Sequence, residues 1–190
     1  MSSIKLTADS GGGTFEIKAP ASSGNTRVLT LPDTGNYILG GKVLQVVQTI
    51  KKDAFETSQS VGSGYADITG LSVTITPSST SSKIYIMSTL YNSNNNAVNF
   101  FRILRGSTFI EQPSFTSSGG ANYNAHGFAY FDHQYQDTTV INILDSPSTE
   151  SATTYKVQTA CTSNVVTINQ FFNTSNYAGI TTLTAMELAS

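Results

Sequence analysis

The residues best equipped for chemistry in this sequence form one short cluster, His126, Asp132 and His133. Imidazole and carboxylate groups can bind a metal or transfer a proton, but a metal site needs three or four ligands that converge. Asp132 and His133 are neighbours in a predicted strand, so we expect their side chains to point to opposite faces. The pattern favours a hydrogen-bonded, partly buried histidine, and we predict no metal site and no cofactor.

Other catalytic signatures are missing from the sequence. Cys161 continues the strand face of Tyr155 and Val157, which indicates a small core residue rather than a nucleophile. Residues 11–13 are glycines, but no Lys-Ser/Thr pair follows them as in a phosphate-binding loop. No glycosidase pair can be singled out among the 12 acidic residues. We therefore predict that the protein is not an enzyme. The competing hypothesis, a β-sandwich hydrolase, requires a working Cys161 or a cleft with perturbed carboxylates.

The composition is typical of an ordered chain with an uncharged polar exterior. The 190 residues are 38% hydrophobic and 12% charged, below the usual values of roughly 45–50% and 25%. The 9 Tyr and 10 Phe, with many Val, Ile and Thr residues, favour β-strands. The net charge is -2 and no basic run exists, so we expect no nucleic-acid partner. The sequence has neither an apolar stretch of roughly 20 residues nor a signal peptide, so we expect no membrane partner and no export.

Residues 1–41 differ from the rest of the chain, because short apolar segments alternate there with Gly, Pro and Asn turn residues. Such a segment has too little apolar surface to be stable alone, so it needs another chain or a docking surface. We predict an N-terminal β anchor or assembly segment over 1–41. Its predicted contact residues are Ile4, Leu6, Phe15, Ile17, Val28 and Leu31.

Residues 42–190 are expected to form one displayed domain built almost entirely of strands. Apolar and polar residues alternate, with turn residues between the runs, over 71–76, 83–91, 98–104, 108–111, 128–135, 138–144, 154–161, 165–171 and 181–188. The segment 42–52 is apolar on both faces; a helix is the alternative there, but β-branched residues favour a strand buried on both sides. This spacing predicts an all-β fold, an antiparallel β-sandwich or jelly roll.

Two predicted strands, 98–104 and 128–135, carry apolar side chains on both faces. Only the inner face of each sheet is buried in a two-layer sandwich, so a loop or another subunit must cover the second apolar face. We favour a subunit interface. The predicted interface residues are Phe100, Phe101, Phe128, Tyr130 and Phe131.

Two polar loops are predicted at 92–96 and 112–125, and they suggest a second kind of partner. Polar amides beside an aromatic ring can hold a host surface glycan, and the candidate contacts are Asn94, Phe115 and Tyr123. Flexible loops of β-sandwiches have the same composition without any ligand. Both interpretations remain open at this point.

The N-terminal stretch SIKLTADSGGGTFEIKAPASSGNTRVLTLPDTG resembles short-strand modules near the N-termini of structural proteins in marine tailed bacteriophages. The segments LSVTITPSSTSS, FRILRGSTFI, ILDSPSTESATTYKVQ and TLTAMEL resemble the β-rich outer domains of those proteins. The resemblance covers nearly the whole chain. It implies a structural virion protein assembled in the host cytoplasm, either a capsid decoration or knob or a tail fibre, in contact with a major capsid or tail protein. The strand order is also similar to that of trimeric jelly rolls of the complement-C1q and tumour-necrosis-factor type, which implies a homotrimer.

Overall fold

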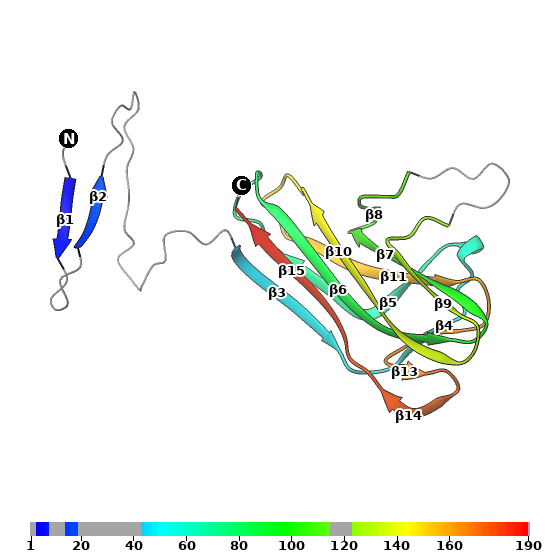
Figure 1. Ribbon diagram of the computed structural model, residues 1–190. Coiled ribbons are helices and arrows are strands. Elements are labelled where there is room, and N and C mark those ends of the chain that lie inside the picture. Colours follow the sequence, from blue (N-terminus) through cyan, green and yellow to red (C-terminus); the bar gives the residue numbers. More distant parts are fainter. Residues whose placement is uncertain (1–2, 8–13, 19–42, 115–122, 190) are drawn as a thin grey trace. The chain divides into compact units, whose positions relative to one another are not determined.

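The chain divides into two units, Met1–Leu39 and Gly40–Ser190. The computed structural model describes residues 3–7, 14–18, 43–114 and 123–189. Most of the described residues belong to the second unit, which contains both large sheets (Figure 1).

The first unit contains one antiparallel hairpin, formed by β1 (Ser3–Thr7) and β2 (Thr14–Lys18). Its register sets Ile4 opposite Ile17 and Leu6 opposite Phe15, so four of the predicted anchor residues fall in directly opposed pairs. The other two, Val28 and Leu31, lie outside the described residues.

The second unit is built from two antiparallel sheets. Across the first sheet the strands are β3 (Val43–Lys51), β15 (Thr181–Leu188), β6 (Lys83–Asn94) and β10 (Tyr135–Asp145). Beyond the end of β15, the same edge of β6 pairs with β12 (Val166–Ile168), which in turn pairs with β4 (Phe55–Thr57). Across the second sheet they are β5 (Ala66–Ile75), β11 (Thr153–Cys161) and β7 (Ala97–Arg105), with β8 (Thr108–Phe109) and β9 (Gly127–Phe131) on the far edge of β7. A 3-10 helix (Val61–Ser63) and a hairpin of β13 (Gln170–Phe171) and β14 (Thr174–Ala178) complete the unit.

The chain crosses repeatedly between these two sheets. β3, β6, β10 and β15 belong to the first sheet, and β5, β7, β9 and β11 belong to the second. Eight strands shared in this way between two antiparallel layers form a jelly roll. The predicted fold class, an all-β antiparallel sandwich, is therefore confirmed.

The core lies between the inner faces of the two sheets, and it follows from strand alternation. In β6, Ile84, Ile86, Ser88 and Leu90 are fully buried, while the residues that alternate with them point outwards. The second sheet contributes Phe101 and Tyr155, which are also fully buried. Other core residues are Leu71, Val73, Ile75, Ile103, Ile141, Val157, Ile168, Leu183 and Ala185.

Three predicted boundaries differ from the structure. The expected loop at 92–96 is strand as far as Asn94, because buried amides replace apolar groups there: Asn99 Nδ2 donates to Asn92 Oδ1, and Asn94 Nδ2 donates to Asn99 Oδ1. The expected strand 165–171 is interrupted at Asn169, whose φ of 61° ends the extended conformation. The expected strand 128–135 ends at Phe131.

The strand at 42–52 is confirmed, but its predicted burial on both sides is wrong within the described residues. Leu44, Val46 and Ile50 of β3 are each about half exposed, at 50%, 55% and 50%. β3 lies at the edge of the first sheet, and these three side chains point away from the second sheet.

A buried carboxylate joins the two layers. Asp145 of β10 in the first sheet is 4% exposed, and Arg105 of β7 donates from Nη1 to both its carboxylate oxygens at 2.8 Å. The hydroxyl of Tyr155 on β11 donates to Asp145 Oδ2 at 2.6 Å. Burial, together with the neighbouring Asp145 carboxylate, raises the pKa of Tyr155. Because a buried charge is costly without partners, these contacts fix where β10 lies relative to the second sheet.

We expect Tyr155→Phe to destabilise the domain by about 1.5–3 kcal/mol, the usual contribution of a hydrogen bond to a charged group. Urea unfolding followed by fluorescence measures this change. Tyr130→Phe is the matched control, because Tyr130 is 70% exposed and its hydroxyl should contribute within about 0.5 kcal/mol. Equal unfolding midpoints for the two variants would show that the Tyr155 hydroxyl does not hold the carboxylate.

Candidate functional site

His126 and Cys161, two of the candidates for chemistry, are both held within the fold. His126 is partly buried and Cys161 is fully buried. His126 Nδ1 accepts a hydrogen bond from the Ile103 amide at 2.9 Å, and its Nε2 lies 2.8 Å from the Ile110 carbonyl oxygen. Burial lowers the pKa of His126, which fits a neutral ring held between two backbone groups. Cys161 is 1% exposed, and burial raises the pKa of its thiol. A protonated, buried thiol is a poor nucleophile.

Asp132 and His133 lie on an exposed bend after β9 rather than within a strand. The expectation that they point to opposite faces is therefore wrong, since Asp132 Oδ1 and His133 Nδ1 approach to 3.6 Å with both side chains largely in solvent. An exposed pair of this kind contributes little to stability. Among the described residues, no three His, Cys, Asp or Glu side chains form a group that could hold a metal ion.

The outer face of the first sheet carries several exposed apolar side chains. We define this outer face by the residues of β3, β15, β6 and β10 that point away from the second sheet. The register aligns Val46, Met186, Tyr85 and Leu144 in one apolar row across all four strands. A second row contains Ile50, Thr182, Thr89 and Val140, and a more polar row of Gln48, Thr184, Met87 and Asn142 separates the two.

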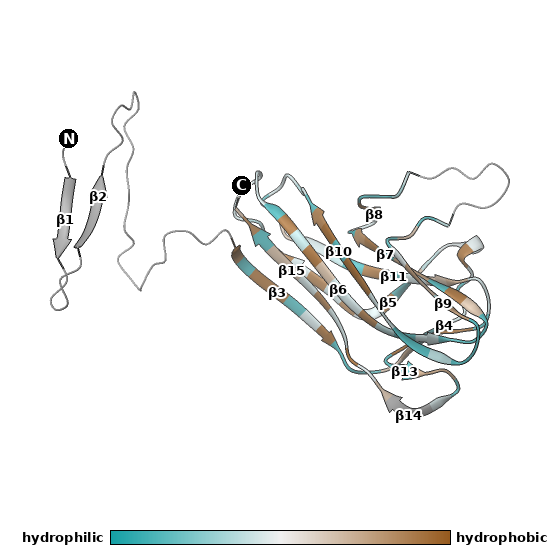
Figure 2. Ribbon diagram, in the orientation of Figure 1, coloured by the Kyte–Doolittle hydropathy of each residue, from teal (hydrophilic) through white to brown (hydrophobic). Residues whose placement is uncertain are grey.

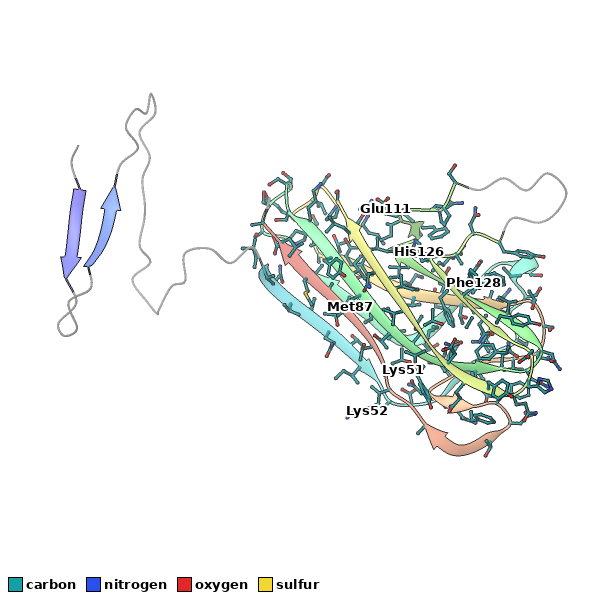
Figure 3. All side chains as sticks on the ribbon, viewed as in Figure 1. Lys51, Lys52, Met87, Glu111, His126 and Phe128 are labelled. Carbon is teal, nitrogen blue, oxygen red and sulfur yellow. The ribbon has the colours of Figure 1, made fainter. Side chains whose placement is uncertain are left out.

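This outer face has almost no charge. Lys83, at one end of β6, is the single charged residue among the outward positions of the four strands. Val46, Val140 and Leu144 are 50–55% exposed. Figure 2 shows hydrophobic colouring along β3 and β10 at the two edges of this sheet, and Figure 3 places Met87 on β6 between them. Exposed apolar surface that is continuous across a sheet is typical of an interface.

The predicted interface residues divide between the core and the second sheet's outer face. Phe101 and Phe131 are 0% and 2% exposed within one subunit, so they have no surface to offer another subunit. Phe128 and Tyr130 of β9 are each 70% exposed, and Phe100 lies opposite Phe128 in the register. Figure 3 labels Phe128 on this strand. For Phe100, Phe128 and Tyr130 the interface stays a prediction, as the alternative to a contact through the outer face of the first sheet.

Of the three candidate glycan contacts, one is buried, one lies outside the described residues and one is exposed. Asn94 is fully buried in the amide network described above, so it cannot reach a ligand. Phe115 lies outside the described residues. Tyr123 is 44% exposed, and its ring packs at a tilt of 54° against that of Phe100, with ring centroids 5.6 Å apart.

A pocket beside these aromatic residues was not foreseen from the sequence. It has a volume of about 400 Å³, and its described lining residues are Val61, Gly64, Tyr65, Arg102, Leu104, Ser107, Phe109, Gln112 and Asn124. Arg102 stands on the outer face of β7, with its guanidinium 4.0 Å from the Tyr65 ring centroid and 5.4 Å from that of Phe109. The one sign of this pocket in the sequence is a basic residue, Arg102, that lies between aromatic residues.

A second buried carboxylate was also missed, although alternation in TLTAMEL puts Glu187 on the inner face with Leu183 and Ala185. Glu187 is 0% exposed. Its Oε1 accepts hydrogen bonds from the Ser78 amide, the Ser78 hydroxyl and the Ser82 hydroxyl at 2.6–2.7 Å, and its Oε2 accepts one from Gln45. Burial opposes ionisation, but these donors together lower the pKa of Glu187 to about 2.

The comparisons with known proteins find similarity among solved structures alone. No family model matches the chain, and no curated protein matches it. One similar structure is the D431N mutant VP2 protein of infectious bursal disease virus in T=1 particles, at 14% identity and TM-score 0.40 over 97% of this chain and 44% of that chain. Another is infectious bursal disease virus of the Gx strain, at 15% identity and TM-score 0.39 over 98% of this chain and 47% of that chain. This chain spans less than half the length of either. No helix among the described residues is long and apolar enough to cross a membrane.

The lowered pKa of Glu187 predicts how the stability of the folded protein depends on pH. Its folded-state pKa of about 2 lies below the ordinary value of 4.5, so the folded protein binds fewer protons than the unfolded chain. The stabilisation by Glu187 is therefore complete above pH 4.5 and is lost as the pH falls from 4.5 towards about 2.

Urea midpoints measured at neutral pH and through this acid range test the assignment. We expect Glu187→Gln to be less stable than the parent at neutral pH and to lose part of the acid dependence. Glu150→Gln, which alters an exposed carboxylate, should follow the parent curve. Parallel curves for the parent and Glu187→Gln would contradict the assignment.

Proposed function

We propose that this protein is a non-enzymatic structural component of a virion, a trimeric decoration or knob on the exterior of a tailed-phage capsid. The observation that carries the proposal is the nearly uncharged, apolar outer face of the first sheet on an otherwise self-sufficient jelly roll. A domain that already has a complete core needs such a surface for association rather than for its own folding.

Copies of the same chain are the partners that suit this outer face best. A partner carrying charges would bury them against apolar side chains without counter-charges, which is costly. Around a three-fold axis, this face of each copy would bring Val46, Tyr85 and Leu144 close to similar groups, with Lys83 at one end as the single charge on it. Closed homo-oligomers are the usual result of self-association. The resemblance of the sequence to trimeric jelly rolls of the C1q type supports three subunits.

The N-terminal unit has the proposed role of attachment. A two-stranded hairpin is marginally stable by itself, so β1 and β2 need a partner surface. A segment that requires a partner, ahead of a domain that does not, suits an anchor followed by a displayed head. A major capsid protein is the proposed docking partner; in the alternative, a tail fibre, the partner is a tail protein.

The subunit contact can be tested with two matched variants. We expect the parent to be a trimer by light scattering, and the double variant Val46→Glu, Leu144→Glu to be a folded monomer, because it places buried like charges in the contact. Phe128→Ser, which removes an exposed apolar group from the other sheet, should stay trimeric. Dissociation by Phe128→Ser alone would move the interface to Phe100, Phe128 and Tyr130, and a monomeric parent would refute the trimer.

The attachment role can be tested on particles. We expect an electron cryomicroscopy map of the intact virion to show residues 1–41 in contact with a capsid protein and the jelly roll facing outwards. Deletion of 1–41 should leave the jelly roll folded but unable to bind particles. Particle binding by the truncated protein at the level of the full chain would contradict the anchor.

A further inference from the structure

The pocket around Arg102 combines features that a purely structural arginine does not need. Arg102 is the one charged side chain among its described lining residues. Its Nε donates to Gln158 Oε1 at 2.8 Å, whereas the described residues provide no hydrogen-bond acceptor for its two Nη atoms. The open edge of the guanidinium therefore keeps its donors available in a pocket of about 400 Å³, within the range of ligand sites.

A series of hydrogen bonds on the same sheet face fixes the position of Arg102. Gln158, whose side-chain oxygen accepts from Arg102, donates from Nε2 to Asp67 Oδ1 at 2.6 Å. Lys156 donates to Asp67 Oδ2 at 2.7 Å. The Asp67 carboxylate is thus occupied by Lys156 and Gln158, and the arginine keeps its net positive charge toward the pocket. Such support fixes a ligand-binding group before the ligand arrives.

The aromatic rings restrict the arginine further. Tyr65 and Phe109 both lie within cation–π distance of the guanidinium. The Tyr65 hydroxyl donates to the Asn124 carbonyl oxygen at 3.0 Å, which ties the ring to the pocket wall. A planar guanidinium with its two Nη groups open matches a carboxylate, which accepts two parallel hydrogen bonds.

The surroundings of the pocket indicate what carries the carboxylate. Ser107, Gln112 and Asn124 are polar lining residues that can exchange hydrogen bonds with hydroxyl groups. Tyr123 adjoins the lining residue Asn124 in the chain, and its ring packs at a tilt against Phe100. Phe100 precedes Arg102 by two positions on the same strand face. The negative faces of such rings attract the partly positive C–H groups of a sugar ring.

We infer that this pocket binds an acidic sugar, with the carboxylate of a uronic acid residue on the Nη atoms of Arg102 and the sugar ring toward Tyr123 and Phe100. The inference extends the proposed function by giving the displayed domain a recognition role toward acidic surface polysaccharides. It rests on residues of one subunit alone. Its failure would therefore leave the trimer and the anchor untouched, and a monomeric parent would leave this site intact.

Calorimetric titration of the full chain with a short oligogalacturonate provides the test. We expect binding to the parent, and about tenfold or greater weakening in Arg102→Gln. Arg102→Lys keeps the positive charge but loses the planar guanidinium that donates two parallel hydrogen bonds, so it should also weaken binding. Lys83→Gln removes the same charge from the other sheet and should bind like the parent.

The methyl ester of the same oligosaccharide separates the carboxylate from the sugar. We expect the ester to bind far more weakly than the acid, and Gln158→Met, which removes the support of Arg102, to weaken binding of the acid. Thermal unfolding confirms that each variant is folded; if Arg102→Gln does not fold, Arg102→Lys and the ester carry the test. Absence of binding to the parent, equal binding of acid and ester, or undiminished binding by folded Arg102 variants would overturn the inference.

Discussion

The long strand β6 is hydrogen-bonded along both edges, and the rest of the jelly roll depends on this pairing. β10 pairs with one edge from Ile84 to Asn94, while β15 and β12 share the other. Because side chains alternate along a strand, the inner residues of β6 build the core and the outer residues, Tyr85 and Met87 among them, must face something else. The same geometry thus produces a closed core and an outer face suited to assembly.

Buried polar groups that have hydrogen-bond partners set the relative positions of the strands. Asp145 connects the two layers through Arg105 and Tyr155, and Glu187 ties β15 to β3 and to the turn before β6. The amides of Asn92, Asn94 and Asn99 do the same for the β6–β7 connection. Unpaired, these groups would be costly, so the network penalises any slip in register. In a chain with one buried cysteine and no possible internal disulfide, such contacts supplement the apolar core.

The two outer faces of the sandwich differ in chemistry, which allows different roles. The first sheet presents aliphatic, Met and Thr side chains with one charge at its end. The second sheet presents aromatic rings and a supported arginine. Our proposals assign association of subunits to the first face and recognition of an acidic sugar to the second. A sandwich has two outward faces, so the two proposed roles do not compete for one surface.

The sequence by itself determined the fold class and most strands, because alternation and turn residues are local signals. The strand at 181–188 was predicted to the residue, and Cys161 was correctly assigned to the core. Only the tertiary structure decided which face of each strand is covered, since that depends on residues distant in sequence. Phe101 and Phe131 proved to be core residues, and Asn94 was found in a buried network. Tyr65 before β5 and Gln158 on β11 come beside Arg102 only when β5, β7 and β11 are paired.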